Sequence, residues 1–170
     1  MMFVTATVLD LVHAFRRDEP RDEMVRIIAR ESRLAEARLH AYVVMSHHVH
    51  LVIHLSKTMD IRKFMQRLKP NAGRSISRLL TSEDLAEFDA QHGLNSNTFW
   101  QRSFRSVEIV GDNMLEQKLD YIHQNPVKAE YVVRPEEYRW SSARLFEQGL
   151  WSAEKGLPFE AVAESVVKPD

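Results

Sequence analysis

Two short runs of strand-forming residues, separated by only two residues, constrain the fold of this chain more than any other feature. Leu39–Met45 and His48–Leu55 are rich in aliphatic and β-branched side chains, and only Ser46 and His47 lie between them. A connection this short joins antiparallel neighbours in one sheet. The sequence therefore predicts a β-hairpin in this part of the chain.

The segments around the hairpin predict alternating strands and helices. Met2–Val12 has the Val, Thr and Phe content of a buried strand, and Glu23–Arg33 carries apolar residues at helical spacing. A second helix is expected to begin at the N-cap Asp60, with Pro70 and Gly73 interrupting it. The later elements are predicted to be a helical fragment and loop at Thr81–Thr98, an extended segment at Phe99–Val110, a helix capped by Asp112 or Asn113 and ending at Asn125, and a short helix after Arg144.

This order of elements predicts an α+β fold in which an antiparallel sheet carries helices packed on one face, as in ferredoxin-like proteins. The 170 residues, 44% of them hydrophobic, suffice for one well-packed domain, which we expect at 1–147. Residues 148–170 are expected to form a C-terminal tail. No stretch approaches the ~20 apolar residues of a membrane span and no signal peptide is evident, so we expect a soluble, cytoplasmic protein. The absence of cysteine excludes thiolate metal sites and cysteine catalysis.

A pair of histidines opens the second run of the hairpin. The two-residue period of a strand places His48 and His50 on one face, with Val49 on the other. Two neutral imidazoles on one face can share a divalent ion, although such a pair is also consistent with a structural or exposed role. Ala41–Lys57 contains no Asp or Glu, so an iron site of two histidines and one carboxylate cannot be completed locally. A metal with few anionic ligands keeps its charge available for an anionic substrate such as phosphate.

The neighbouring histidines are expected to lie outside this pair. His47 falls in the turn, where we predict it to be exposed. His54 shares a face with His50 but lies roughly 13 Å further along the strand, which is too far to bind the same ion. We interpret His54 as a rim or hydrogen-bonded histidine.

Tyr121 and Asn125 are four residues apart, so a helix stacks them on one face. This spacing lets one helix present a nucleophile and a neutral oxygen ligand, although it is equally consistent with an ordinary surface helix. A phenol of pKa ~10 is mostly protonated at neutral pH, and it attacks a phosphate only if a base accepts its proton or the phosphate is activated. A metal ion can supply that activation, with Asn125 as a third ligand through its amide oxygen.

Four motifs in sequence order carry a family resemblance. They are Ala41–Ile53 (AYVVMSHHVHLVI), Phe99–Arg102 (FWQR), Tyr121–Val127 (YIHQNPV) and Tyr138–Ser142 (YRWSS). Together they resemble the single-tyrosine HUH transposases, and most closely the REP-associated branch related to the IS200/IS605 group. The likeness runs from about Phe3 to Phe146.

The resemblance implies an enzyme that cleaves and rejoins single-stranded DNA beside hairpins, using Mg²⁺ or Mn²⁺. His48, His50 and Asn125 would hold the metal, and Tyr121 would form a 5′-phosphotyrosine intermediate. Relatives are monomers or homodimers. This chain departs from the family pattern in having Ser46–His47 where Pro-Asn is usual, and in the Pro70 and Gly73 that follow the histidine strand.

DNA binding must rest on local charge, because the formal net charge is −1 and the isoelectric point is about 6.7. Six cations lie between Ile61 and Leu80 with no acidic residue, and either a DNA-binding surface or a solvated helix face would explain them. They are Arg62, Lys63, Arg67, Lys69, Arg74 and Arg78. Arg102 and Arg105 form a second candidate, since the adjacent Phe99, Trp100 and Phe104 could stack on unpaired bases, although Trp100 is as consistent with a core position.

Two other functions fit parts of this pattern. A DNA-hairpin-binding regulator would keep the fold and the basic helix without catalysis. A metal hydrolase would use His48 and His50 to activate water, and it would need a nearby carboxylate base, for which Glu116 and Asp120 are the candidates.

Overall fold

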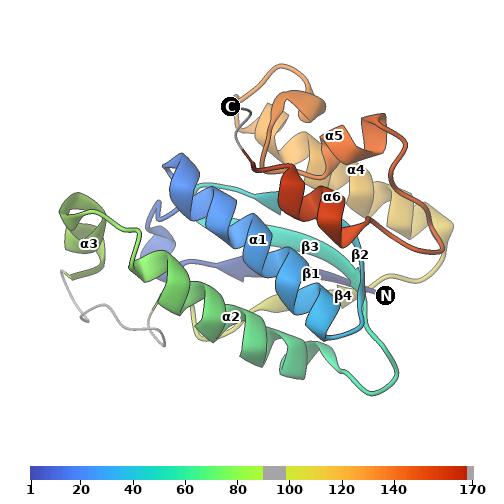
Figure 1. The fold of residues 1–170 in the computed structure, drawn as a ribbon, viewed down its shortest axis with the longest axis horizontal. Coiled ribbons are helices and arrows are strands. Elements are labelled where there is room, and N and C mark those ends of the chain that lie inside the picture. The colour runs from blue at the N-terminus through green and yellow to red at the C-terminus, as the bar shows by residue number, and fades with distance from the viewer. Residues whose placement is uncertain (90–98, 168–170) are drawn as a thin grey trace.

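Four antiparallel strands form one sheet at the centre of the protein (Figure 1). The computed structural model describes residues 1–89 and 99–167. The strands are β1 (Met2–Thr7), β2 (Arg38–Val44), β3 (His48–His54) and β4 (Arg105–Glu108), in the spatial order β2-β3-β1-β4. The hairpin expected from the sequence is the β2–β3 pair, and the strand order is that of a ferredoxin-like sheet. The predicted α+β class is therefore confirmed.

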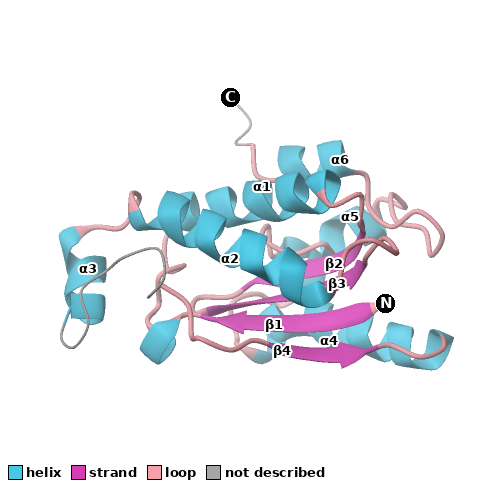
Figure 2. Ribbon diagram, turned by 90° about the horizontal axis from the view of Figure 1, so that it is seen from below, coloured by secondary structure: helices cyan, strands magenta, loops and turns pink. Residues whose placement is uncertain are grey.

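Helices cover both faces of the sheet, so the expectation of helices on one face was wrong (Figure 2). α1 (Asp18–Leu34) and α2 (Ile61–Ser77) pack on one face, where Val4, Leu51 and Ile53 join the larger hydrophobic core. α4 (Asp112–Lys128) packs on the other face, where Leu115, Leu119 and Ile122 meet Ala41, Val43 and Val52 of the hairpin in a second core. Because successive side chains of β3 alternate between the two faces of the sheet, each face receives every second side chain of the strand.

Both prolines expected to end or interrupt a helix lie inside one. α2 begins at its N-cap Asp60, whose side chain accepts a hydrogen bond from the Lys63 backbone at 2.8 Å as expected, and it continues through Pro70 to Ser77. α4 likewise continues past Asn125 through Pro126 to Lys128. An interior proline costs about 3 kcal/mol. In α2 the buried residues on either side of the proline, Leu68 and Ile76, offset that cost, and in α4 the proline itself is buried beside Ile122.

The C-terminal segment covers the outer edge of β2 and extends the core, rather than forming a free tail. Ser141 bridges to Val43, and the Val44 backbone donates to Trp140 O at 2.9 Å, so this edge strand is paired. α5 (Ala143–Glu147) follows, and α6 (Phe159–Glu164) packs on α1. Leu157, Val162 and Val166 are buried in the same core as the sheet.

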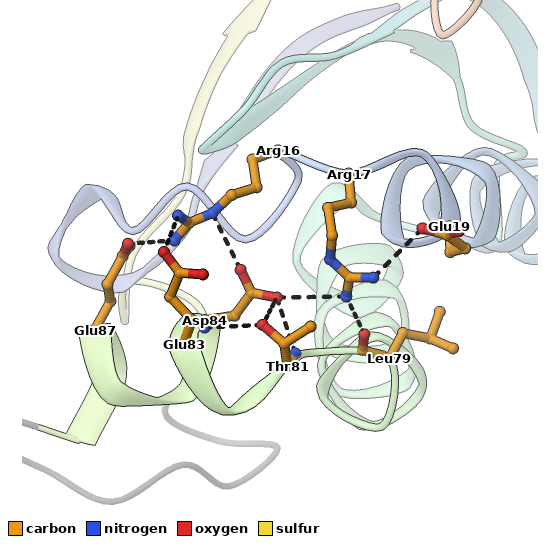
Figure 3. A network of polar contacts seen from close by, with 8 residues as sticks. All are labelled: Arg16, Arg17, Glu19, Leu79, Thr81, Glu83, Asp84 and Glu87. Atoms are coloured by element: carbon orange, nitrogen blue, oxygen red, sulfur yellow. Dashed lines mark hydrogen bonds and ion pairs between the residues drawn. The ribbon is translucent and has the colours of Figure 1, made fainter.

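An ion-pair network fixes α3 (Ser82–Asp89) against the segment that precedes α1 (Figure 3). The buried carboxylate of Asp84 pairs with Arg16 Nε at 3.0 Å and with Arg17 at 3.3 Å, and it also accepts from the Thr81 hydroxyl at 3.0 Å. Arg16 pairs with Glu87 as well. These two arginines are therefore structural. Residues 90–98, the second half of the expected loop, lie outside the described residues.

His40 is a buried histidine beside the irregularity in the β2–β3 register. Its side chain is 0% exposed, and neither ring nitrogen has a hydrogen-bond partner within the described ranges. Burial lowers the pKa of His40 from 6.5 to about 4, with the positive charge of Arg38 adding to the effect. The folded protein therefore resists protonation of this ring.

Replacing His40 with leucine is expected to make the free energy of unfolding less sensitive to acid. The unfolded chain binds a proton here below pH 6.5 and the folded chain only near pH 4, so wild-type stability falls as the pH is lowered through this window. At pH 5 this loss is about 2 kcal/mol. Urea unfolding at pH 7 and pH 5 measures it, with the exposed His13→Gln as control. If the free energy of unfolding of His40→Leu falls between pH 7 and pH 5 by as much as that of the wild type, the assignment of this acid sensitivity to His40 is contradicted.

Candidate functional site

His48 and His50 lie side by side on the face of the sheet that α4 covers. Their ring centroids are 4.7 Å apart, and His50 is buried while His48 is partly accessible. Burial lowers the pKa of His48 to about 4 and that of His50 to about 3, and the charges of neighbouring His48 and Lys118 add to the effect on His50. Both rings are therefore neutral at pH 7, the state in which imidazole binds a metal ion.

Thr5 fixes the orientation of the His50 ring. β1 pairs with β3 so that Thr5 lies directly opposite His50, and the Thr5 hydroxyl is 2.8 Å from His50 Nδ1. If Nδ1 carries the proton and donates to Thr5, the lone pair of Nε2 is free to bind a cation. Metal-binding histidines commonly donate the second ring N–H to an oxygen acceptor, and the Thr5 hydroxyl oxygen is such an acceptor beside His50.

Tyr121 reaches the same place from α4, 71 positions further along the chain. Its ring centroid is 5.3 Å from that of His50, and its side chain is 41% exposed. Phe3 holds the two together, because it stacks on His50 with centroids 5.3 Å apart and meets the edge of Tyr121 at 5.7 Å. The packing of Leu119 and Ile122 against the sheet turns this side of α4 toward the histidines.

Asn125 lies one helical turn beyond Tyr121 on the same side of α4. Its amide nitrogen donates to Tyr121 O at 2.8 Å, which leaves the amide oxygen to accept or to bind a cation. Among the described residues no three His, Cys, Asp or Glu side chains are arranged to hold a metal ion. Neutral imidazoles and amide oxygens are ligand types that divalent ions accept.

The proposed carboxylate bases of a metal hydrolase do not join this group. Glu116 and Asp120 are exposed. His123 sits on another side of α4, and burial lowers its pKa to about 4, an effect that the negative charge of Asp120 partly opposes. Its Nε2 lies 2.8 Å from Ser142 Oγ, so it attaches α4 to the C-terminal segment.

The five cations of α2 and its C-cap Arg78 lie across the sheet from the histidines and Tyr121. α2 packs on the α1 face, whereas α4 packs on the opposite one (Figure 2). Arg67 pairs with the buried Glu31 at 3.3 Å, and Lys69 donates to Gln101 O at 2.6 Å, so both have structural partners. The other four are exposed, and they are Arg62, Lys63, Arg74 and Arg78.

The second basic candidate is only partly available for DNA. Phe99 and Trp100 are buried in the larger core, where Trp100 Nε1 donates to Lys69 O at 2.9 Å, so they do not form a base-stacking surface. Arg102 and Arg105 are exposed. Arg105 lies opposite Thr5 in the β1–β4 register, which places it on the same face as His50. Arg105, one of the predicted DNA-binding cations, therefore lies in the same cross-strand row as Thr5 and His50.

The departures from the family pattern leave the hairpin intact. Ser46 accepts a hydrogen bond from the Tyr131 hydroxyl at 3.0 Å, which ties the turn to the loop after α4. His47 was predicted to be exposed, but it is half-buried, with its ring centroid 4.6 Å from His48 and 5.3 Å from His13. His54 accepts from Arg38 at 2.8 Å, which confirms its interpretation as a hydrogen-bonded rim residue.

The sequence analysis missed Thr5, Phe3 and Lys118 as members of this site. Lys118 Nζ lies 4.9 Å from the Phe3 ring centroid. A signal for the first two was present, because alternation along β1 puts Phe3 and Thr5 on one face, away from the buried Val4 and Ala6. Which strand lies beside β3 could not be read from that alternation.

Comparison with known proteins decides the family. The family model described as "Transposase IS200 like" matches residues 12–125, about two thirds of the chain. The chain belongs to the IS200-like transposase family. A DNA transposase role follows from that membership. No curated protein sequence matches this transposase well enough to count as a relative.

Solved structures share the fold of this transposase. One, described as a REP-associated tyrosine transposase bound to a REP hairpin, has a TM-score of 0.67 and 19% sequence identity, covering 89% of this chain and 81% of its own. Another, a putative transposase from Deinococcus radiodurans, has a TM-score of 0.51 and 20% identity, covering 72% and 88%. Within the described part of the transposase, no helix is both long and apolar enough to span a membrane.

Proposed function

We propose that this transposase cleaves and rejoins single-stranded DNA beside hairpins, with Tyr121 as nucleophile and a divalent ion on His48, His50 and Asn125. The observation that carries the proposal is the meeting of Tyr121 with His50, whose ring centroids lie 5.3 Å apart although they come from different elements. A nucleophile with an accessible side chain beside two neutral metal-binding imidazoles is what a phosphoryl transfer to tyrosine requires.

The chain's own residues perform four tasks in this reaction. His48 and His50 would hold the ion as neutral imidazoles, Thr5 would keep His50 in the metal-binding tautomer, and Phe3 keeps the Tyr121 ring against His50. A bound Mg²⁺ or Mn²⁺ would supply Lewis-acid activation of the scissile phosphate. The Tyr121 hydroxyl then attacks phosphorus, the bond to the 3′-oxygen breaks, and the 5′-phosphate stays on the tyrosine. Attack by a second 3′-hydroxyl reverses these steps and rejoins the strand, so no nucleotide hydrolysis is needed.

Hairpin DNA is the proposed substrate, from two lines of support. The structure with a TM-score of 0.67 is described as bound to a REP hairpin. Arg105, on the same face as His50, and the exposed cations of α2 supply phosphate-binding charge at the site and on the opposite face. A monomer or a homodimer is compatible with this proposal.

An adduct assay tests the proposal. The full chain is incubated with end-labelled single-stranded hairpin DNA and Mn²⁺, and the products are separated on a denaturing gel. We expect a covalent protein–DNA band that requires the metal. Cleavage without an adduct would indicate a metal hydrolase, and binding without cleavage would indicate a hairpin-binding regulator, so either outcome overturns the proposal.

Replacing Thr5 with valine is expected to weaken Mn²⁺ binding about 10-fold, since losing a hydrogen bond that orients a metal-binding histidine costs that order of affinity. Isothermal titration calorimetry of Mn²⁺ into the DNA-free protein measures the change. Thr7→Val is the matched control, because Thr7 lies on the same face of β1, opposite His48, and its hydroxyl has no histidine partner within residues 1–89 and 99–167. Equal Mn²⁺ affinities for the two variants would show that Thr5 does not orient the ligand.

A further inference from the structure

Two lysine side chains of α4 flank Tyr121. Lys118 precedes it by one helical turn and Lys128 follows it by two, so all three side chains share one side of the helix. Lys118 Nζ lies 5.9 Å from the centroid of the Tyr121 ring and 4.9 Å from that of Phe3. Lys128 Nζ lies 5.8 Å from the Tyr121 centroid. The phenol therefore stands between two ammonium groups.

Neither ammonium is neutralised by an acid in the described part of the chain, where no carboxylate lies within ion-pair distance of Lys118 or Lys128. No acid of α4 lies three or four residues from Lys118, the spacing at which helix side chains meet. Two uncompensated cations beside one accessible tyrosine favour an anionic ligand at that place.

The position of Lys118 differs from that of an ordinary surface lysine. It is half-buried, and its ammonium lies over the Phe3 ring, which also stacks on His50. Lysine is flexible, and this contact with an aromatic face restricts where its charge is held. The charge is therefore positioned beside both the nucleophile and the metal-binding histidines, before any DNA arrives.

We propose that Lys118, assisted by Lys128, is a phosphate-binding catalytic residue that holds a non-bridging oxygen of the scissile phosphate beside Tyr121, an inference that rests on the proposed function. His48 and His50 would hold an ion that supplies positive charge to the phosphate, and the ammonium groups would add positive charge from α4. Positive charge on both sides stabilises the negative charge that spreads over the phosphate oxygens in the transition state.

The ammonium groups change no bond in this step. The bond from Tyr121 Oη to phosphorus forms while the bond from phosphorus to the 3′-oxygen breaks. The phenol proton passes to solvent, and the departing 3′-oxygen takes up a proton from solvent. Lys118 keeps its protons throughout, so its contribution is a fixed charge and a hydrogen-bond donor.

Two substitutions separate charge from packing. Lys118→Met keeps the apolar stem over Phe3 and removes the charge, whereas Lys118→Arg keeps the charge. We expect Lys118→Met to form the Tyr121 adduct 10- to 100-fold more slowly, and Lys118→Arg to recover most of the rate. Lys155→Met, an exposed lysine in the loop between α5 and α6, should retain the wild-type rate. Thermal unfolding of each variant shows whether the fold is kept.

A binding measurement without metal gives a second readout. The oligonucleotide carries a single uncharged methylphosphonate at the linkage that the wild type cleaves, and its affinity in EDTA is compared with that of the unmodified strand. The wild type should bind the methylphosphonate strand several-fold more weakly than the unmodified strand, whereas Lys118→Met should bind the two strands equally.

If the wild type forms no adduct, the proposed function fails. If the wild type forms the adduct and folded Lys118→Met matches its rate, the phosphate role of Lys118 is overturned and the proposed function stands.

Discussion

Replacing Tyr121 with phenylalanine is expected to abolish the covalent protein–DNA adduct, while hairpin binding stays near the wild-type level. The substitution removes one hydroxyl from a ring that is 41% exposed and keeps the ring contacts with Phe3 and His50. Without the hydroxyl no phosphotyrosine bond can form, so the loss should be complete. The denaturing gel measures the adduct, and a mobility shift without metal measures binding.

A second tyrosine supplies the matched control for this variant. Tyr131 is 43% exposed, and its hydroxyl donates to Ser46 in the hairpin turn rather than facing the histidines. Tyr131→Phe should therefore still form the adduct. His48→Ala should form it slowly even at high Mn²⁺, because one of the two imidazoles is missing. An adduct that persists in Tyr121→Phe would assign the nucleophile to another residue.

Replacing Gly156 with alanine is expected to destabilise the protein by about 2 to 4 kcal/mol. Gly156 has φ +74°, a conformation that costs other residues about 1 to 2 kcal/mol. A Cβ atom there would lie 2.5 Å from Leu39 O and 3.2 Å from Leu39 C, both backbone atoms of β2 that cannot move freely. Crowding by a single methyl group adds about 1 to 2 kcal/mol, in the lower part of the range for overpacking. The loss should lower the melting temperature by roughly 4 to 16 °C in a chain of this length.

Gly149 isolates the backbone part of that cost. It has φ +70°, and a Cβ atom there would meet nothing within 4 Å. Gly149→Ala should therefore cost only about 1 kcal/mol, or roughly 2 to 4 °C. Calorimetry of both variants compares them directly. If the two lose equal stability, the close packing of residues 148–167 on β2 has no energetic weight.

Much of the fold could be predicted from local pattern because hairpins and amphipathic helices are local events. The two-residue connection at Ser46 and His47 fixed the hairpin, and the Asp60 cap fixed the start of α2. The continuation of both helices through Pro70 and Pro126 could not be predicted, since it depends on burial against distant residues. The same is true of α4 crossing to the far side of the sheet.

The candidate site was predictable only as separate pieces. Strand period placed His48 and His50 on one face, and helix period placed Tyr121 with Asn125. Their meeting depends on the packing of α4, which local pattern does not encode, and the family likeness had to supply it. The family likeness did not indicate Thr5, Phe3 or Lys118. Each belongs to the site only through its contact with a residue on another element.

The sheet divides the protein into two compartments with different chemical character. The exposed cations of α2 lie in one, and Tyr121 with His50 lies in the other. A nucleic acid that touched both would have to turn around a rim of the sheet, because the strands leave no passage through it. The β2 rim is closed by Trp140 and Ser141, whereas the β4 rim carries no further strand in the described part of the chain. Arg105 stands on that open rim, facing the tyrosine compartment, so a DNA strand that turns around this rim passes it.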